Sequence, residues 1–481
     1  METFDPSNPM GVNLDSDTPW DDEHPNPEDT PAGEKYLSGQ ARMAYRLAAS
    51  HSNKLMHVYG LGWFYWTGTH WAEDTKGRAL RAVTTVLQAA AAEWVETNED
   101  ALAKDVKACM SASAHEGVLK LAASAPQLSA DVDDLDADPY LLNVSNGTLD
   151  LRTLDLRAPR PADRITRKTK GAYLPNLAPS DNWTRFLDVS LPNTEVRDML
   201  QRYVGQALVG RTLEQKLLIL TGRGGNGKSV WTGAIEFALG DYAITPQADM
   251  VLSKKHEGAF DGSVELRGRR WAVFSEVDKG RELAPATLKR LTGNDRITAR
   301  QLYSKNITFS PSHSFAMVAN HLPEVPDASR GMWRRLRVVP FDQEIAEEDQ
   351  DQDLPMKLEA EADTVLTWAV MGWSDYSERG LAEPQSVLAA TDSYQQKSDQ
   401  LSRFLADCTT TGSIGTLNTT NLFALYEQWL GAASESSTYT RNKLSEAMKE
   451  RGYDNRGKGH LWRKGNAPLM EVQGWRDHLS E

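Results

Sequence analysis

Residues 216–229 read KLLILTGRGGNGKS, which is an apolar run, a glycine-rich loop and the start of a helix. Every fixed position of the pattern G-x-x-x-x-G-K-[ST] is filled between Gly222 and Ser229. Residues 217–221 have the composition of a buried strand, and apolar residues recur at helical spacing after the loop until Gly240. This stretch therefore predicts a strand, a phosphate-binding loop and a helix in succession.

Glycines suit a loop whose backbone N–H groups must approach a triphosphate closely. Lys228 is placed to reach the β- and γ-phosphates, and Ser229 offers a hydroxyl to Mg²⁺. Both residues open a helix, and the dipole of a helix favours anions at its N-terminus. We therefore expect ATP and Mg²⁺ to bind here, in a cradle formed by Gly222, Arg223, Gly224, Gly225, Asn226, Gly227, Lys228 and Ser229.

Length and composition limit the class of protein. The 481 residues are enough for about three domains of roughly 150 residues each. No apolar run is long enough to span a membrane, and the N-terminus has no basic start followed by an apolar segment. The two cysteines, Cys109 and Cys408, are not in metal-ligand spacing. We expect a soluble, cytoplasmic protein with no membrane partner, no disulfide and no zinc site.

Charge is distributed unevenly along the chain, whose net charge is −14. Residues 1–35 hold ten acidic residues and one lysine, a difference of −9, together with six prolines. This composition predicts a disordered acidic tail, which either solubilises the protein or competes with nucleic acid for a basic channel. Residues 261–340 hold fourteen Lys and Arg against eight Asp and Glu, a difference of +6. Such a local basic surface can bind phosphate backbones whatever the total charge.

An N-terminal α+β domain is expected over residues 36–180. Aromatic residues at 57–71 predict two short strands, whose tryptophans would either pack in a hairpin core or stack on bases. Helices are predicted at about 78–99 and 101–121, a strand, turn and strand at 143–151, and a basic strand at 164–170. A helical collar, forming a small bundle of its own, is expected over residues 181–212.

Three further strands are expected after the glycine-rich loop, within an α/β core over residues 213–345 that has a parallel sheet and flanking helices. In a P-loop fold, an acid at the carboxyl end of a strand holds magnesium and activates water. The first strand is Trp271–Phe274, which Ser275, Glu276 and Asp278 follow. The second is Ser314–Ala319, which Asn320 follows. The third is Leu336–Phe341, which Arg334 and Arg335 precede.

Through these residues the chain resembles the superfamily 3 helicases, specifically the phage and plasmid primase–helicase group that is related to the poxvirus primase–helicase. The resemblance is strongest from about Asn143 to Phe341. The matching segments are Gly222–Ser229, Phe274–Glu276, Leu288–Asp295, Ala319–Pro323, and Trp333–Arg335 through Pro340–Phe341.

The resemblance implies an ATPase of the AAA+ type that forms a ring, expected to be a hexamer, and moves along single-stranded DNA by hydrolysing ATP. It implies that Lys228 and Ser229 hold the triphosphate and magnesium, that Glu276 activates water and that Asn320 senses the γ-phosphate. Arg334 or Arg335 would be the finger supplied to the neighbouring subunit's site. Several relatives carry two adjacent acids where this chain has Ser275 and Glu276, so the candidate magnesium ligands are Ser229, Glu276 and Asp278.

The family also has a hairpin between the second and third of these motifs, with its tip in the channel of the ring. Residues 297–309 have this position. Arg300 and Lys305 suit phosphates, and Tyr303 could stack on a base. The alternative is a surface hairpin with ordinary charges.

Beyond the core, a helical linker is expected over residues 346–395 and a winged-helix domain over residues 396–481. A basic hairpin at 456–465, which contains Lys458, would be the wing that contacts duplex DNA. A protein-interaction domain is the alternative interpretation of this region.

The expected partners are single-stranded and forked DNA and further copies of the chain, in the host cytoplasm if the gene belongs to a phage. No acidic metal-binding cluster of a primase precedes the collar, so a separate primase or polymerase is a candidate partner. Two other classes remain open. A small-molecule kinase would show an arginine-rich lid and an acceptor pocket, and neither is recognisable. A replication initiator or loader would use ATP only as an assembly switch.

Overall fold

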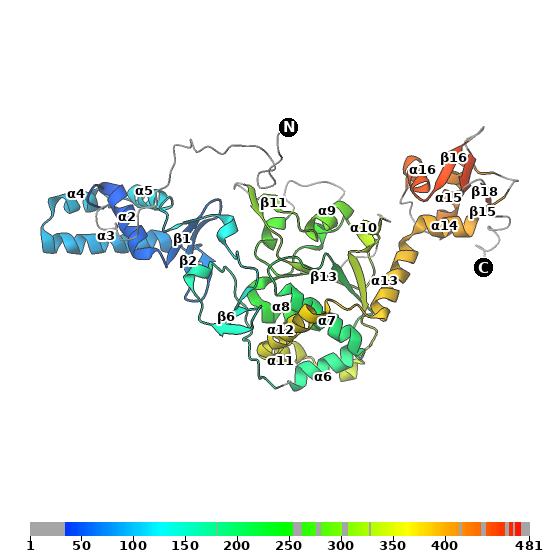
Figure 1. Cartoon of the computed structure of the whole chain (residues 1–481), viewed down its shortest axis with the longest axis horizontal. Coiled ribbons are helices and arrows are strands. Elements are labelled where there is room, and N and C mark those ends of the chain that lie inside the picture. Colours follow the sequence, from blue (N-terminus) through cyan, green and yellow to red (C-terminus); the bar gives the residue numbers. More distant parts are fainter. Residues whose placement is uncertain are drawn as a thin grey trace, which may run out of the picture. The chain divides into compact units, whose positions relative to one another are not determined.

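A five-stranded parallel sheet lies at the centre of the larger part of the chain, in the order β14-β8-β13-β10-β9 (Figure 1). The computed structural model describes residues 34–472 except 179, 254–261, 276–279, 301–305, 327–328, 413–415, 434–438, 457–460 and 465–466. Of the predicted acidic tail, residues 1–33 lie outside this part. The strands are β8 (Leu217–Thr221), β9 (Ala243–Ile244), β10 (Trp271–Phe274), β13 (Ser314–Ala319) and β14 (Leu336–Pro340).

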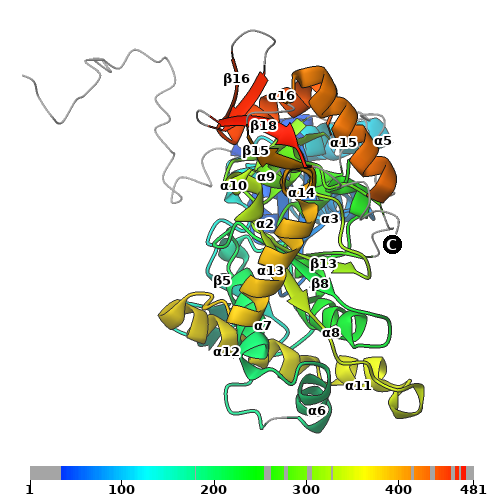
Figure 2. The same ribbon diagram turned by 90° about the vertical axis from the view of Figure 1, so that its right-hand side faces the viewer.

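Alternate residues of the sheet belong to two hydrophobic cores, one on each face. Leu218 and Leu220 of β8 join the first core, whereas Leu217 and Ile219 join the second. Helices α7, α8, α11 and α12 lie on one side of the sheet, and α9 and α10 on the other, in both views (Figures 1 and 2). The helices of this part of the chain, with α6 and α13 included, are α6 (Asp181–Ser190), α7 (Thr194–Ala207), α8 (Lys228–Leu239), α9 (Pro285–Leu291), α10 (Arg330–Trp333), α11 (Leu354–Ala360), α12 (Ala362–Arg379) and α13 (Gln385–Ser398).

Helices from two ranges that the sequence set apart contribute to the first core. Met199 and Tyr203 of α7, in the predicted collar, pack in the same cluster as Leu220 and Trp231 of the sheet layer. Val365 and Leu366 of α12, in the predicted linker, belong to that cluster too. The bundle of its own that we expected at 181–212 is therefore not observed, because the apolar faces of these helices are buried against the sheet layer.

Residues 34–56 and 75–129 form a separate compact unit of four helices. One helix was predicted over 101–121, but the structure has two, α4 and α5, interrupted at Cys109–Ser111. Ser111 begins the second helix because its hydroxyl accepts a hydrogen bond from the Ala114 N–H. The helices are α2 (Gly39–His51), α3 (Arg78–Thr97), α4 (Asp100–Ala108) and α5 (Ala112–Ala122).

Two small sheets precede the parallel sheet in the chain. The aromatic stretch forms three strands rather than two, in a sheet of order β3-β2-β1-β4, and the predicted strand, turn and strand are present in a sheet of order β5-β6-β7. The basic strand predicted at 164–170 is absent. There, the backbone N–H and hydroxyl of Thr166 bond the Asp136 carboxylate. Single backbone bonds join Ile165 to Trp71 of β3 and Thr169 to Asn143 of β5. The strands are β1 (Leu55–Val58), β2 (Gly62–Trp66), β3 (Trp71–Glu73), β4 (Ser129–Ala130), β5 (Leu141–Val144), β6 (Gly147–Asp150) and β7 (Asp155–Arg157).

The C-terminal region has a core of its own, in which Phe404, Tyr426 and Trp462 are buried. Three helices accompany a four-stranded sheet of order β15-β18-β17-β16. The elements are α14 (Gln400–Cys408), β15 (Thr409–Thr411), α15 (Thr419–Ala433), α16 (Arg441–Glu450), β16 (Tyr453–Arg456), β17 (Leu461–Lys464) and β18 (Ala467–Glu471). Among the helices of the described ranges, none is both long and apolar enough to cross a bilayer.

Candidate nucleotide-binding site

The glycine-rich loop leaves the carboxyl end of β8, the strand that lies between β13 and β14. Thr221 pairs with Ala319 on one side and with Pro340 on the other, and the Phe341 N–H donates to the Thr221 carbonyl at 2.7 Å. The loop then enters α8 at Lys228. The sheet therefore places residues that follow β13 and β14 directly beside the loop, although about a hundred residues separate them in sequence.

Two of the loop glycines are required by close contacts. A Cβ atom on Gly222 would lie 2.2 Å from Asn226 Nδ2 and 2.3 Å from the Phe341 carbonyl oxygen. Gly227 has a φ of +84°, and its Cβ would lie 2.5 Å from Ser190 Oγ at the end of α6. A Cβ atom on Gly224, in contrast, would have no atom within 4 Å apart from its chain neighbours. The loop is therefore packed against the protein at Gly222 and Gly227 and open at Gly224, where a ligand could contact its backbone, whereas the Gly225 carbonyl already accepts from the Ile345 N–H at 3.1 Å.

Lys228 is buried and held by the loop itself. Its Nζ donates to the carbonyls of Gly222 at 2.8 Å and Arg223 at 3.1 Å, and to Asn226 Oδ1 at 2.9 Å. Burial lowers the pKa of this ammonium. Asn226 also donates from Nδ2 to the Phe341 carbonyl at 2.9 Å, so its amide joins the lysine to the end of β14. The sequence placed Asn226 in the cradle but carried no signal for this bridging role.

A cavity of about 250 Å³ adjoins the loop. Its walls are the backbone and side chains of loop residues together with the segment that follows β14, namely Gly222, Arg223, Gly224, Asn226 and 341–344. Arg223 and Ser229 are exposed at this edge of the sheet. Open glycine backbone, a lysine and a helix N-terminus form a donor set that suits a phosphate chain. The residues present therefore fit a nucleotide.

The polar residues expected beside the loop follow strands that reach the same edge. Asn320 is exposed and comes directly after Ala319, the partner of Thr221. Phe274, the last residue of β10, pairs with Met317 of β13. Glu276 and Asp278 follow it but lie outside the described residues, so their roles stay predictions.

Arg334 and Arg335 occupy different environments at the opposite edge of the sheet. Arg334 is exposed, and its Nη2 reaches Gln215 Oε1 at 3.3 Å. Arg335 is buried and donates to Thr292 Oγ1 at 3.1 Å and to the Gly331 carbonyl at 2.6 Å. Burial, and then the charge of Arg334, lower the pKa of Arg335. Sequence reasoning treated the two as equivalent and missed Gln215 and Thr292 as their partners.

The distance between these arginines and the loop of the same chain follows from the sheet. The Leu217 N–H donates to the Arg335 carbonyl at 2.7 Å, so Arg335 lies beside the start of β8. Gly222 follows the far end of that strand, and five residues of strand span roughly 16 Å. Neither arginine is therefore positioned at its own phosphate loop.

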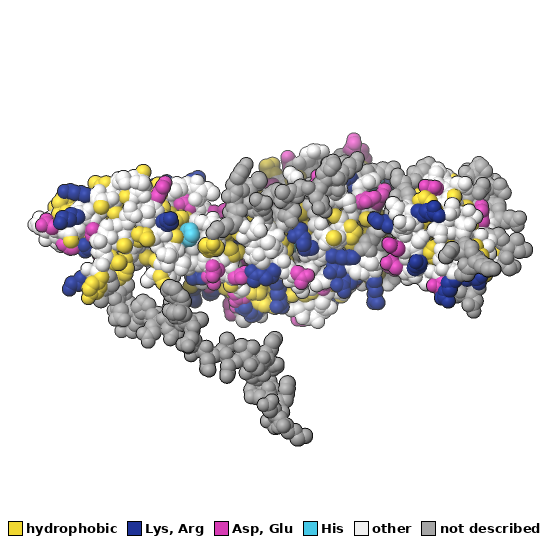
Figure 3. Space-filling model, turned by 90° about the horizontal axis from the view of Figure 1, so that it is seen from above, with side chains coloured by type: hydrophobic (Ala, Val, Ile, Leu, Met, Phe, Trp, Pro, Cys, Tyr) yellow, Lys and Arg dark blue, Asp and Glu magenta, His cyan; other side chains and the backbone are white. Residues whose placement is uncertain are grey.

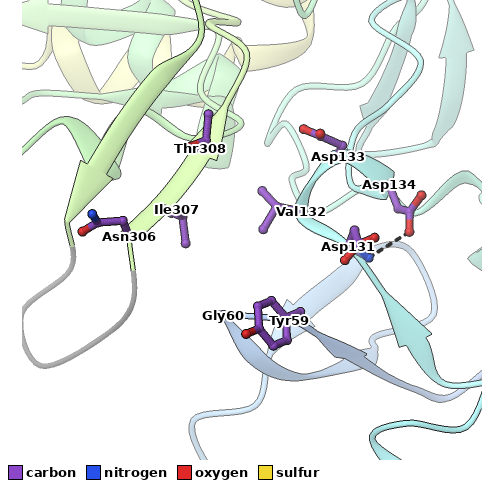
Figure 4. Close-up of a pocket in the computed structure, with 9 residues that line it drawn as sticks. All are labelled: Tyr59, Gly60, Asp131, Val132, Asp133, Asp134, Asn306, Ile307 and Thr308. Carbon is purple, nitrogen blue, oxygen red and sulfur yellow. Dashed lines mark hydrogen bonds between the residues drawn. The ribbon is translucent and has the colours of Figure 1, made fainter. Parts of the chain in front are cut away.

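The hairpin expected between β10 and β13 is present as β11 (Ile297–Arg300) and β12 (Asn306–Phe309), paired antiparallel. Its root is held by Arg296, whose Nη2 donates to both oxygens of Asp133, at 2.8 and 2.9 Å, and to the Thr308 carbonyl at 3.2 Å. In Figure 4, Val132 points toward Ile307 beside the Tyr59–Gly60 turn, at a cavity of about 360 Å³. Tyr303, Lys305 and the Arg300 side chain lie outside the described part, as does Lys458 between β16 and β17.

Positive and negative side chains are mixed over one face of the described part of the chain (Figure 3). On the face drawn in Figure 3, the Lys and Arg side chains of the described residues lie among Asp and Glu side chains. Any binding of nucleic acid to that face must therefore depend on local groups rather than on a broad positive field.

The fold and this loop define a mixed α/β protein with a parallel sheet and a glycine-rich strand–loop–helix at its carboxyl edge. Two family models match the chain. Residues 44–192 match the family described as D5 N terminal like, and residues 220–335 match a family of unknown function, DUF5906.

Viral proteins are similar to the chain over about half of its length. "Putative helicase L207/L206" of Acanthamoeba polyphaga mimivirus is 30% identical over 299 residues, 57% of this chain and 31% of that protein. "Putative helicase 022R" of Frog virus 3 is 27% identical over 52% of this chain and 28% of that protein. "Putative primase C962R" of African swine fever virus is 27% identical over 43% of this chain and 22% of that protein. The chain thus covers less than a third of the length of these relatives.

Among solved structures, the apo NrS-1 C-terminal region aligns over 87% of this chain and 96% of that chain, with a TM-score of 0.46 and 10% identity. The chain thus shares a D5 N terminal like region, and similarity over about half of its length, with proteins of large DNA viruses that are named as helicases or primases.

Proposed function

We propose that the chain is the ATP-driven motor of a DNA helicase, which forms a ring and moves along single-stranded DNA by hydrolysing ATP. The observation that carries the proposal is the loop between β8 and α8, with open glycine backbone, a buried lysine and the ends of β13 and β14 on either side. An AAA+ core of superfamily 3 is the specific fold proposed, and the similarity to viral proteins named as helicases supports it.

Lys228 would exchange its bonds to the loop carbonyls for bonds to the β- and γ-phosphates of ATP. Three acceptors within the loop already hold the ammonium in place without a ligand. Binding of the phosphates would therefore cost little conformational entropy, because the lysine is already ordered. Backbone N–H groups around Gly224 would bind the remaining phosphate oxygens. Asn320 would contact the γ-phosphate from the end of β13.

Mg²⁺ would neutralise charge that develops on the phosphates during transfer. Ser229 at the start of α8 is the candidate ligand that the structure describes, and Glu276 and Asp278 are the candidates from the segment after β10. Glu276 would also take the proton of the attacking water. Arg334, exposed and remote from its own loop, is the better candidate for the finger that a neighbouring subunit receives.

The test is the rate of ATP hydrolysis with and without single-stranded DNA. Lys228→Ala should abolish turnover, because it removes the charge that binds the phosphates, while the exposed-lysine control Lys357→Ala should keep it. Glu276→Gln should bind ATP and trap the assembled ring, since it removes the base but keeps the size of the side chain. Normal turnover in Lys228→Ala contradicts the proposal. Slow hydrolysis that single strands do not stimulate would instead support an ATP-switched initiator or loader.

A further inference from the structure

A second polar cavity lies at the edge of the sheet opposite to the glycine-rich loop. Its volume is about 470 Å³, and segments that precede β8, β10 and β13 form its walls together with part of the stretch before β5. Because the loop follows the carboxyl end of β8, this cavity is distinct from the candidate nucleotide site. The lining includes Pro139, Gly210, Arg211, Arg267, Gly268, Arg296 and 309–312.

Three arginines line this cavity, and their carboxylate partners are few and exposed. Arg267, itself 8% exposed, bonds Glu73 at 2.9 Å, and Arg296 bonds Asp133 at 2.8 Å. The side chains of Glu73 and Asp133 are 54% and 59% exposed, so water competes for both ion pairs. Arg211 bonds the Tyr140 hydroxyl at 2.6 Å and has no carboxylate partner among the residues that the structure describes.

A buried donor beside the cavity lacks an acceptor. Arg167 Nε has no hydrogen-bond partner in the described structure, and a Cβ on Gly268 would lie 3.6 Å from it. Burial, and then the charge of Arg167, lower the pKa of Arg267. The Asp136 carboxylate, which also lines the cavity, already accepts two hydrogen bonds from Thr166. The surroundings of Arg267 and Arg167 would therefore be stabilised by an added anion.

We infer that this cavity binds the phosphate group of a nucleotide unit, supplied by a single-stranded nucleic acid or by a free nucleotide. Guanidinium groups present forked donors that match phosphate oxygens. A volume of about 470 Å³ exceeds what a phosphate alone fills and lies in the range of small-molecule sites. Pro139, Phe309 and Pro311 offer apolar wall to a sugar or base. The inference does not depend on ATP hydrolysis, because the site is remote from the loop.

Arg211 and Arg152 provide a matched pair of variants. Both guanidinium groups lie over the Tyr140 ring, at 5.2 and 4.7 Å from its centroid, but only Arg211 lines the cavity. Each should be changed to alanine in the Lys228→Ala background, which removes the charged contact of the loop. One assay is the fluorescence anisotropy of a labelled thymidine oligonucleotide against salt concentration. The other is calorimetric titration with adenosine monophosphate.

Arg211→Ala should weaken binding at least fivefold in one of the two assays. Arg152→Ala should bind with the same affinity as the Lys228→Ala protein in which it is made. If the strand is the ligand, the oligonucleotide assay changes and the slope of log affinity against log salt falls by roughly 0.7. If a free nucleotide is the ligand, the calorimetric assay changes instead. Ser310→Trp, which fills the cavity without changing charge, should reproduce the loss. Equal behaviour of Arg211→Ala and Arg152→Ala in both assays overturns the inference.

The two proposals can fail separately. A chain that never hydrolyses ATP but loses anion binding with Arg211→Ala supports the cavity and contradicts the motor. If single-stranded DNA stimulates hydrolysis but Arg211→Ala leaves anion binding unchanged, the result supports the proposed motor function and contradicts the proposed phosphate site in the cavity.

Discussion

Buried His313, directly before β13, should make the stability of the protein depend on pH. Its ring stacks edge-on against Phe315, with centroids 4.6 Å apart, and its Nε2 lies 3.2 Å from the Leu291 carbonyl oxygen. Burial lowers the pKa of this imidazole from 6.5 to about 4, against a smaller raising effect of the Leu291 hydrogen bond. The neutral ring is therefore the form that the fold accommodates.

We expect the free energy of unfolding to fall as the pH drops from about 6.5 to 4. The folded pKa is below the unfolded one, so the unfolded chain takes up the proton first, and the loss approaches about 3 kcal/mol over that range. His313→Gln should remove this dependence, whereas the exposed control His321→Gln should keep it. Urea unfolding followed by tryptophan fluorescence at pH 7 and pH 5 measures the difference. Equal pH dependence in all three proteins would show that His313 is not the source.

The two adjacent arginines should separate into one structural and one functional residue. Arg335→Gln should lower the free energy of unfolding by about 2 kcal/mol, because the buried guanidinium loses its bonds to Thr292 and Gly331. Arg334→Gln should change it by less than about 0.5 kcal/mol, as expected of an exposed side chain, yet abolish ATP hydrolysis. Thermal unfolding and ATPase rates of both variants decide this. Full turnover in Arg334→Gln would exclude it as the finger.

At the scale of an element, the β11–β12 hairpin is rooted independently of its tip. Ile297, Ala299, Ile307 and Phe309 are buried in the second core, and Arg296 ties the root to Asp133. A change in the tip can therefore alter a binding surface without unfolding the hairpin. This property makes the tip suitable for a test of DNA contact.

Neutralising Arg300 and Lys305 together should weaken single-strand affinity and prevent unwinding. Each lost phosphate contact removes roughly 0.7 from the slope of log affinity against log salt. ATP hydrolysis without DNA should persist, because neither residue adjoins the glycine-rich loop in sequence. The control is Lys357→Ala with Arg379→Ala, which removes two exposed charges elsewhere. Normal unwinding by the hairpin variant would exclude the tip from the mechanism.

At the scale of the whole molecule, the sheet separates the proposed finger from its own loop by the length of β8. Hydrolysis would then require two subunits, one providing Lys228 and the other Arg334. Each subunit of a ring could offer both groups, one on either side of a shared interface.

Mixing two inactive variants, Arg334→Ala and Lys228→Ala, should therefore restore part of the ATPase activity. A fraction of mixed interfaces pairs an intact loop with an intact arginine, and these interfaces can turn over. The measurement is the ATPase rate of the mixture, with mixed assembly verified by size-exclusion chromatography of differently tagged chains. Complete inactivity of verified mixed rings would show that the arginine serves its own subunit or only the fold.

The strand, the glycine-rich loop and the helix of residues 217–239 were determined by the sequence alone. Their signals are local, since apolar periodicity and glycines act over a few residues at a time. The antiparallel hairpin at 297–309 was expected from the resemblance to the helicase family rather than from a local signal, and β11 and β12 are paired there. Local signals were weaker at 164–170, where alternating basic residues suggested a strand but Asp136, thirty residues away, bonds the backbone.

Tertiary structure alone decided which of these residues meet. Asn226 is bonded to Phe341, Arg335 is buried while Arg334 is exposed, and α7 and α12 share one core, because distant segments pack together. The arginine-lined cavity likewise arises where the loops before three parallel strands converge at one edge. Burial and long-range hydrogen bonds depend on the order of strands in the sheet, and residue spacing along one chain does not encode that order locally.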